Sequence, residues 1–87
     1  MNHAETANRA GVALADMDWL LQGDVSGNVA SRLGLPIADI EYFIRGSATA
    51  NMTRRLGLQA ISAAEELAQA AGRQGAIGIV IGLLMSI

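Results

Sequence analysis

Residues 26–45 decide the fold expected for this chain, and they read Ser-Gly-Asn-Val-Ala-Ser-Arg-Leu-Gly-Leu-Pro-Ile-Ala-Asp-Ile-Glu-Tyr-Phe-Ile-Arg. Ala30 is small, and four residues later Gly34 can adopt the left-handed backbone conformation of a tight turn at little cost. Pro36 suits the first turn of a helix, where its missing N–H would have no intrahelical partner anyway. The stretch therefore predicts two short helices that are joined by a tight turn and pack closely at Ala30.

The apolar positions expected to hold these two helices together are Val29, Leu33, Leu35, Ile40 and either Phe43 or Ile44. This pattern resembles the helix-turn-helix of phage and plasmid repressors. Arg45-Gly46 and residues 52–58 resemble the continuation found in the Cro and Xre-like group, so that the resemblance covers residues 26–58. The resemblance implies a DNA-binding domain and a homodimeric transcriptional repressor that acts on a palindromic operator.

The rest of the chain also has helical spacing, so the fold class expected is all-α. Apolar periodicity and glycine breaks predict five helices, at residues 5–22, 28–33, 36–45, 48–56 and 59–71. The first helix is expected to bury Ala10, Leu14, Met17 and Leu21, and the last is expected to bury Ile61, Ala64, Ala68 and Ala71. Residues 72–75 are interpreted as a turn that closes a helix-turn-helix domain spanning residues 1–75.

Composition favours one small domain with a partner. The chain has 87 residues, of which 52% are hydrophobic and only 16% charged, so surplus apolar surface is expected to be covered by self-association. Its net charge of −2 argues against non-specific binding of polyanions. The charge is uneven, because residues 1–26 hold one arginine against four acids, whereas residues 27–57 hold four arginines against two.

Two sets of side chains are candidates for contacts with double-stranded DNA. The residues placed to read bases from the second helix of the motif are Pro36, Ile37, Ala38, Glu41, Tyr42 and Arg45. The residues expected to contact phosphates on either flank are Asn28, Arg32, Ser47, Thr49, Asn51, Arg54 and Arg55. The base-reading set is poor in hydrogen-bonding groups, so the alternative is a protein-interaction module that uses the same fold to bind and inhibit another regulator.

Residues 76–87 contain no charged residue and are expected to be buried. As a helix the segment would be about 18 Å long, too short to cross a bilayer, and its β-branched content also allows a strand. Gly78, Gly82 and Ser86 fall four apart, a spacing that lets two helices approach closely. We expect a dimerisation or core-filling segment, and the predicted dimer contacts are Ile77, Val80, Ile81 and Leu84.

Catalysis has no candidate in the sequence, so the chain is not expected to be an enzyme. His3 is the one histidine and there is no cysteine, which leaves no catalytic triad and no His or Cys metal site within one chain. No cofactor, small-molecule ligand or membrane contact is expected. The absence of cysteine and of a recognisable secretory signal favours the cytoplasm.

Overall fold

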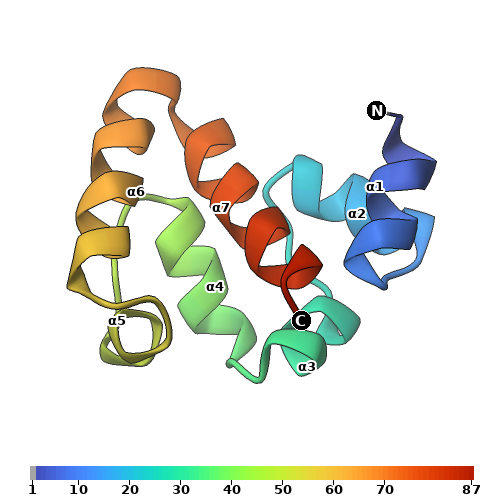
Figure 1. The fold of residues 1–87 in the computed structure, drawn as a ribbon, viewed down its shortest axis with the longest axis horizontal. Helices are drawn as coiled ribbons and strands as arrows, with labels where there is room; N and C mark the ends of the chain where they lie inside the picture. The colour runs from blue at the N-terminus through green and yellow to red at the C-terminus, as the bar shows by residue number, and fades with distance from the viewer. Residues whose placement is uncertain (1) are drawn as a thin grey trace.

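The computed structural model describes residues 2–87, apart from the side chains of Ala60, Ala64, Leu67 and Ala68. Every regular element in this range is an α-helix, which confirms the all-α fold class (Figure 1). In chain order the helices are α1 (His3–Ala10), α2 (Leu14–Leu21), α3 (Gly27–Leu33), α4 (Ile37–Ile44), α5 (Ala50–Leu56), α6 (Leu58–Ala71) and α7 (Arg73–Met85).

The single helix predicted over residues 5–22 is wrong, because the chain breaks at Gly11 and forms α1 and α2 instead. Gly11 has a φ of 73°, and its N–H and that of Val12 return to the carbonyls of Asn8 and Ala7 at 3.2 and 3.1 Å. The predicted apolar face is confirmed in part, because Ala10 and Met17 are fully buried, but Leu21 is only half-buried. Leu14 is 48% exposed, whereas Leu20 is fully buried.

The α3–α4 pair agrees closely with the prediction. The Ser26 hydroxyl accepts the Val29 N–H at 3.3 Å and caps α3. Gly34 ends α3 with a φ of 70°, and the Leu35 N–H then bonds the Ala30 carbonyl at 3.2 Å, as in a Schellman cap. Pro36, with a φ of −62°, stands directly before α4. Local signals thus fix both helices and the turn between them.

The predicted bounds of the next two helices need small corrections. α5 begins at Ala50 rather than residue 48, because Thr49 caps it by accepting the Met52 N–H at 3.3 Å. In α6, Ile61 is buried as expected, but Ala71 is exposed. Ala64 and Ala68, the other two residues of the predicted face, lie outside the described side chains.

The predicted turn at residues 72–75 is wrong, since only Gly72 interrupts the helical backbone and Arg73 already begins α7. α7 then runs through the middle of the molecule (Figure 1). It packs against α6, α4, α1, α3 and α2. Residues 76–85, for which the sequence allows either a helix or a strand, are therefore helical, and this helix contacts both the N-terminal helices and α6.

α7 fills the core, so the predicted dimer contacts need correction. Ile77, Val80 and Leu84 are 1%, 0% and 0% exposed within a single chain, and Ile81 is half-buried. Side chains buried in this way cannot meet a second copy unless the domain opens. Of the two roles expected for residues 76–87, core filling is the one that the packing supports.

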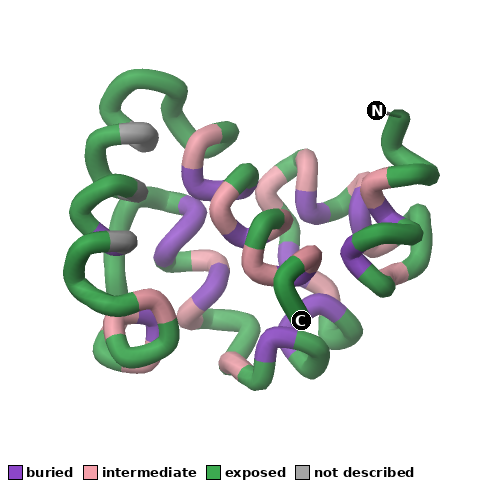
Figure 2. The backbone as a smooth tube through the Cα atoms, in the orientation of Figure 1, coloured by how far each residue is buried: buried purple, intermediate pink, exposed green. Residues whose placement is uncertain are grey.

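The core extends from α1 to α7 and is lined by apolar side chains. Among the described residues no buried side chain is polar or charged, and no buried side-chain nitrogen or oxygen lacks a hydrogen-bond partner. Figure 2 shows buried stretches on the inner sides of α2, α3, α4 and α7, while most of α6 is exposed. This packing leaves the outward face of α4 for the solvent.

Candidate nucleic-acid interface

The predicted base-reading residues share one face of α4. At about 100° per residue, Ile37, Ala38, Glu41, Tyr42 and Arg45 fall within an arc of roughly 140°. Pro36 precedes them as the N-cap and is exposed. All six are exposed except Glu41, which is half-buried, and the two largest apolar side chains, Ile37 and Tyr42, are 41% and 51% exposed.

The opposite face of α4 holds the helix in place. Ile40, Phe43 and Ile44 are 0%, 4% and 2% exposed, and α4 packs against α7, α5 and α3. Because its inner side chains are locked in the core, α4 presents its outer side chains from a rigid support. We refer below to Ile37, Ala38, Glu41, Tyr42 and Arg45 as the α4 face.

α5 adds polar groups beside α4. The Asn51 side-chain N–H donates to Oδ2 of Asp39, in the first turn of α4, at 2.6 Å. The Arg54 guanidinium in turn donates to Oδ1 of Asn51. Two of the predicted phosphate contacts, Asn51 and Arg54, therefore form one hydrogen-bonded group with α4, and a third, Thr49, caps the helix that carries them.

Three arginines give this part of the molecule its positive charge. Arg45 at the end of α4 and Arg54 and Arg55 in the last turn of α5 are all exposed. Ser47, in the loop between the two helices, is exposed as well. The region formed by the end of α4 and by α5 can therefore offer cationic groups to a polyanion, although half-buried Asp39 and Glu41 lie on the same α4 helix.

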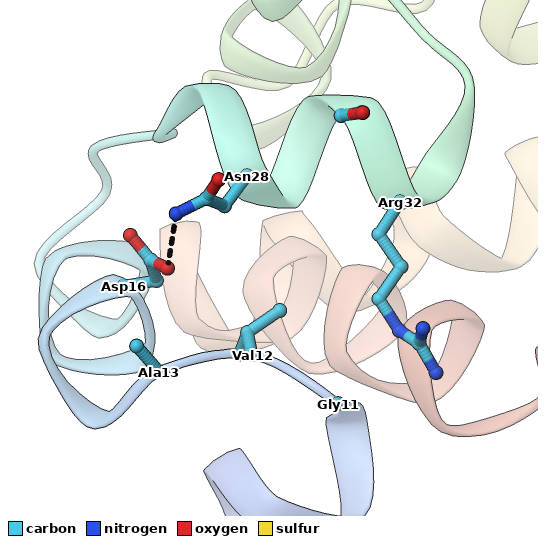
Figure 3. Close-up of a pocket in the computed structure, with 7 residues that line it drawn as sticks. Gly11, Val12, Ala13, Asp16, Asn28 and Arg32 are labelled. Carbon is cyan, nitrogen blue, oxygen red and sulfur yellow. Dashed lines mark hydrogen bonds between the residues drawn. The ribbon is translucent and has the colours of Figure 1, made fainter.

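Asn28 and Arg32, the remaining predicted phosphate contacts, are held on the side of α3 that faces the α1–α2 loop (Figure 3). The Asn28 side-chain N–H donates to Oδ2 of Asp16 on α2 at 3.0 Å, and Arg32 Nε donates to the Ala10 carbonyl at 2.6 Å. Both side chains tie α3 to the N-terminal helices. Asn28 and Arg32 are therefore engaged in contacts within the protein, whereas Ser47, Thr49, Asn51, Arg54 and Arg55 lie after α4 in the loop and on α5.

A pocket of about 370 Å³ lies between α3 and the α1–α2 loop (Figure 3). Its lining consists of Gly11, Val12, Ala13, Asp16, Asn28, Ser31 and Arg32. The one acid and one base in this lining are engaged with neighbouring groups of the protein, Asp16 with Asn28 and Arg32 with Ala10.

Asp39 and Asp16 are the polar residues that the sequence interpretation missed. Each accepts a hydrogen bond from an asparagine 12 positions further along the chain, Asn51 and Asn28 respectively. No local spacing rule connects residues so far apart, because their meeting depends on how separate helices pack. The sequence signals at these positions are those of ordinary solvated acids.

Comparison of the chain with protein-family models, curated proteins and solved structures finds no significant match. Within residues 2–87, no three His, Cys, Asp or Glu side chains are grouped so that they could hold a metal ion. None of the described helices has both the length and the apolar character that a membrane span requires.

Proposed function

We propose that this chain is a sequence-specific DNA-binding protein that uses α3 and α4 as a helix-turn-helix, and that it represses transcription as a homodimer on a palindromic operator. In this proposal α4 enters the major groove and α3 lies across it. The role is one of binding, with no catalytic step and no cofactor.

The α4 face carries the proposal. A reading helix must be firmly supported from behind and open in front, and α4 has three buried side chains on one side and the five outward side chains of the α4 face on the other. The helix has 8 residues, enough for two turns against base edges. Arg54 and Arg55 on α5 stand as candidates for contacts with the flanking phosphates.

Each residue of the α4 face has a chemical role in this proposal. Arg45 can donate to the O6 and N7 acceptors of guanine or to a phosphate, and Glu41 can accept from the amino group of cytosine. Ile37 and Ala38 can contact thymine methyl groups, while the Tyr42 hydroxyl can reach a phosphate or a base edge. The mixture suits a site with alternating apolar and polar contacts.

A protein-interaction module remains the second candidate, favoured by one specific observation. Ile37 and Tyr42 are 41% and 51% exposed on the same face of α4. Exposed apolar and aromatic side chains of this kind are common at the centre of interfaces with another protein. In that case the face would bind and inhibit another regulator. The net charge of −2 is compatible with either candidate.

The homodimer needs a surface other than the core of α7. Among the side chains that the structure describes, the large apolar ones that remain exposed outside α4 are Leu14, Trp19, Leu58 and Ile87. For the proposed operator, a second copy that covered some of these would have to place the two α4 helices in successive major grooves, about 34 Å apart. Sedimentation equilibrium of the intact chain tests this part, with a dimer expected and a monomer at all concentrations against it.

Selection from random duplex DNA tests the function itself. The intact chain is incubated with duplexes of random sequence, and bound fragments are amplified and selected again. We expect enrichment of a palindromic motif whose two halves are about one helical turn apart. Failure to enrich any motif, with capture of a protein partner that is lost in Tyr42→Ala, would favour the interaction module instead.

A further inference from the structure

Two hydrogen bonds link Asp39 on α4, through Asn51, to Arg54 on α5. Asp39 Oδ2 accepts from Asn51 Nδ2 at 2.6 Å, and Asn51 Oδ1 accepts from Nη2 of Arg54. Asp39 and Asn51 are half-buried, whereas Arg54 is exposed. The half-buried end of this hydrogen-bonded group, Asp39, is therefore anionic, and its exposed end, Arg54, is cationic.

The Asn51 amide has only one orientation that satisfies both neighbours. Its NH₂ group must face the Asp39 carboxylate and its oxygen must face the Arg54 guanidinium, because the reverse would oppose acceptor to acceptor and donor to donor. A change at Asp39 therefore alters what Arg54 meets, although no direct bond between Asp39 and Arg54 exists in the structure. The orientation of the Asn51 amide, which the Asp39 carboxylate fixes, thus determines which atom the Arg54 guanidinium meets.

We propose that Asp39 is a positioning residue, which through Asn51 holds Arg54 beside the α4 face in the conformation that meets a DNA phosphate. The inference rests on the proposed function, because it assigns the arginine a phosphate as its target. A free arginine side chain loses rotamer freedom when it binds, and an arginine that is already held loses less. Asp39 thus contributes to affinity although its own charge repels DNA.

The sign of the effect of Asp39→Ala tests the proposal. Removal of an acid near a DNA-binding face should strengthen binding if the charge is all that matters. Positioning predicts the opposite: Asp39→Ala should weaken binding of the selected operator by about threefold to tenfold, the effect expected from the rotamer freedom that an unheld arginine loses on binding. Asp24→Ala is the matched control, because it removes the same charge from an exposed position in the loop between α2 and α3 and should not weaken binding.

Two further variants separate positioning from a general loss of structure. Asp39→Asn keeps an oxygen that can accept from Asn51, so it should retain more affinity than Asp39→Ala. Arg54→Ala should weaken binding relative to the parent and make the slope of log K against log salt shallower by about 0.9, and it should weaken binding less in the Asp39→Ala background than in the parent background. Additive losses, or tighter binding by Asp39→Ala, would overturn the proposal.

The free protein gives a readout that does not depend on DNA. In NMR spectra of the parent, the Arg54 guanidinium should show restricted rotation, and the chemical shift of the Asn51 side-chain amide should differ from that of a solvent-exposed amide. Asp39→Ala should abolish both features. The melting temperature of Asp39→Ala is measured as well, to check that the variant is folded. Unrestricted rotation of Arg54 in the parent would contradict the positioning role. If the parent bound no duplex, the proposed function would be wrong. The NMR measurement on the free protein would then still test whether Asp39 orders the Arg54 side chain.

Discussion

Arg32 Nε on α3 donates a 2.6 Å hydrogen bond to the carbonyl oxygen of Ala10, the last residue of α1. Gly11 follows directly, and a Cβ built there would lie 2.5 to 2.8 Å from three atoms of the Arg32 side chain. A cation against the last carbonyls of a helix also meets the negative end of its dipole. Arg32 therefore fastens α3, and with it the turn to α4, to the N-terminal part of the domain.

Gly11→Ala should destabilise the domain more than Gly34→Ala does. Both positions have a positive φ, 73° and 70°, so both variants bear the strain of a left-handed alanine, about 1–2 kcal/mol. At Gly34 a Cβ would meet nothing within 4 Å, whereas at Gly11 it must displace Arg32, which should cost about 1 kcal/mol more. Urea denaturation measures the difference.

The Arg32→Ala background provides the control for this comparison. Without the guanidinium, the two alanine variants should cost the same, because only the backbone strain remains. A difference that persisted in this background would mean that Arg32 is not what distinguishes the two glycines.

Ala30→Leu should destabilise the α3–α4 junction. Ala30 is 6% exposed, and its carbonyl accepts the N–H groups of both Gly34 and Leu35 in the turn. Three extra carbons at this position overpack the junction and should cost about 1–3 kcal/mol. Thermal melting checks the result, with Ala38→Leu on the exposed side of α4 as the control that should leave stability nearly unchanged. Equal melting temperatures for the two variants would contradict the packing described for Ala30.

Leu84→Ala should destabilise the chain by about 2–5 kcal/mol, because Leu84 is fully buried and its truncation leaves a cavity in the core. Leu58→Ala, at a position that is 75% exposed, should change stability by less than about 0.5 kcal/mol. For the same reason, removal of residues 76–87 should unfold the domain. Circular dichroism of the truncated chain checks this outcome, and a truncated chain that kept its helices and only lost a partner would restore the dimerisation role of these residues.

The sequence predicts the α3–α4 pair well because its signals are local. A capping serine at residue 26, a left-handed glycine at residue 34 and a proline at residue 36 each fix the backbone within a few positions. The break at Gly11 escaped prediction because apolar residues keep helical spacing across it, although a glycine at the end of a helix is itself a local stop signal, and Gly11 turns the chain with a φ of 73°.

The part of the site that depends on contacts between helices could not be predicted. An uncharged segment such as residues 76–87 is equally compatible with an interface and a core, and its burial among α1, α2, α3, α4 and α6 becomes visible only in the structure. The α4 face was predictable, since helical spacing alone separates its residues from Ile40, Phe43 and Ile44. The link from Asp39 to Asn51 was not, because the two residues lie on different helices.

The most direct test of the account is a titration of the selected operator with the parent, Arg45→Ala and Arg9→Ala at several salt concentrations. Arg9 is an exposed arginine on α1, so its removal changes the net charge equally. If the α4 face reads DNA, Arg45→Ala should weaken binding by about 1–3 kcal/mol and relax the preference at one position of each half-site, while Arg9→Ala should bind like the parent. Equal affinities for Arg45→Ala and the parent, or equal losses in both arginine variants, would contradict the claim that the α4 face reads DNA.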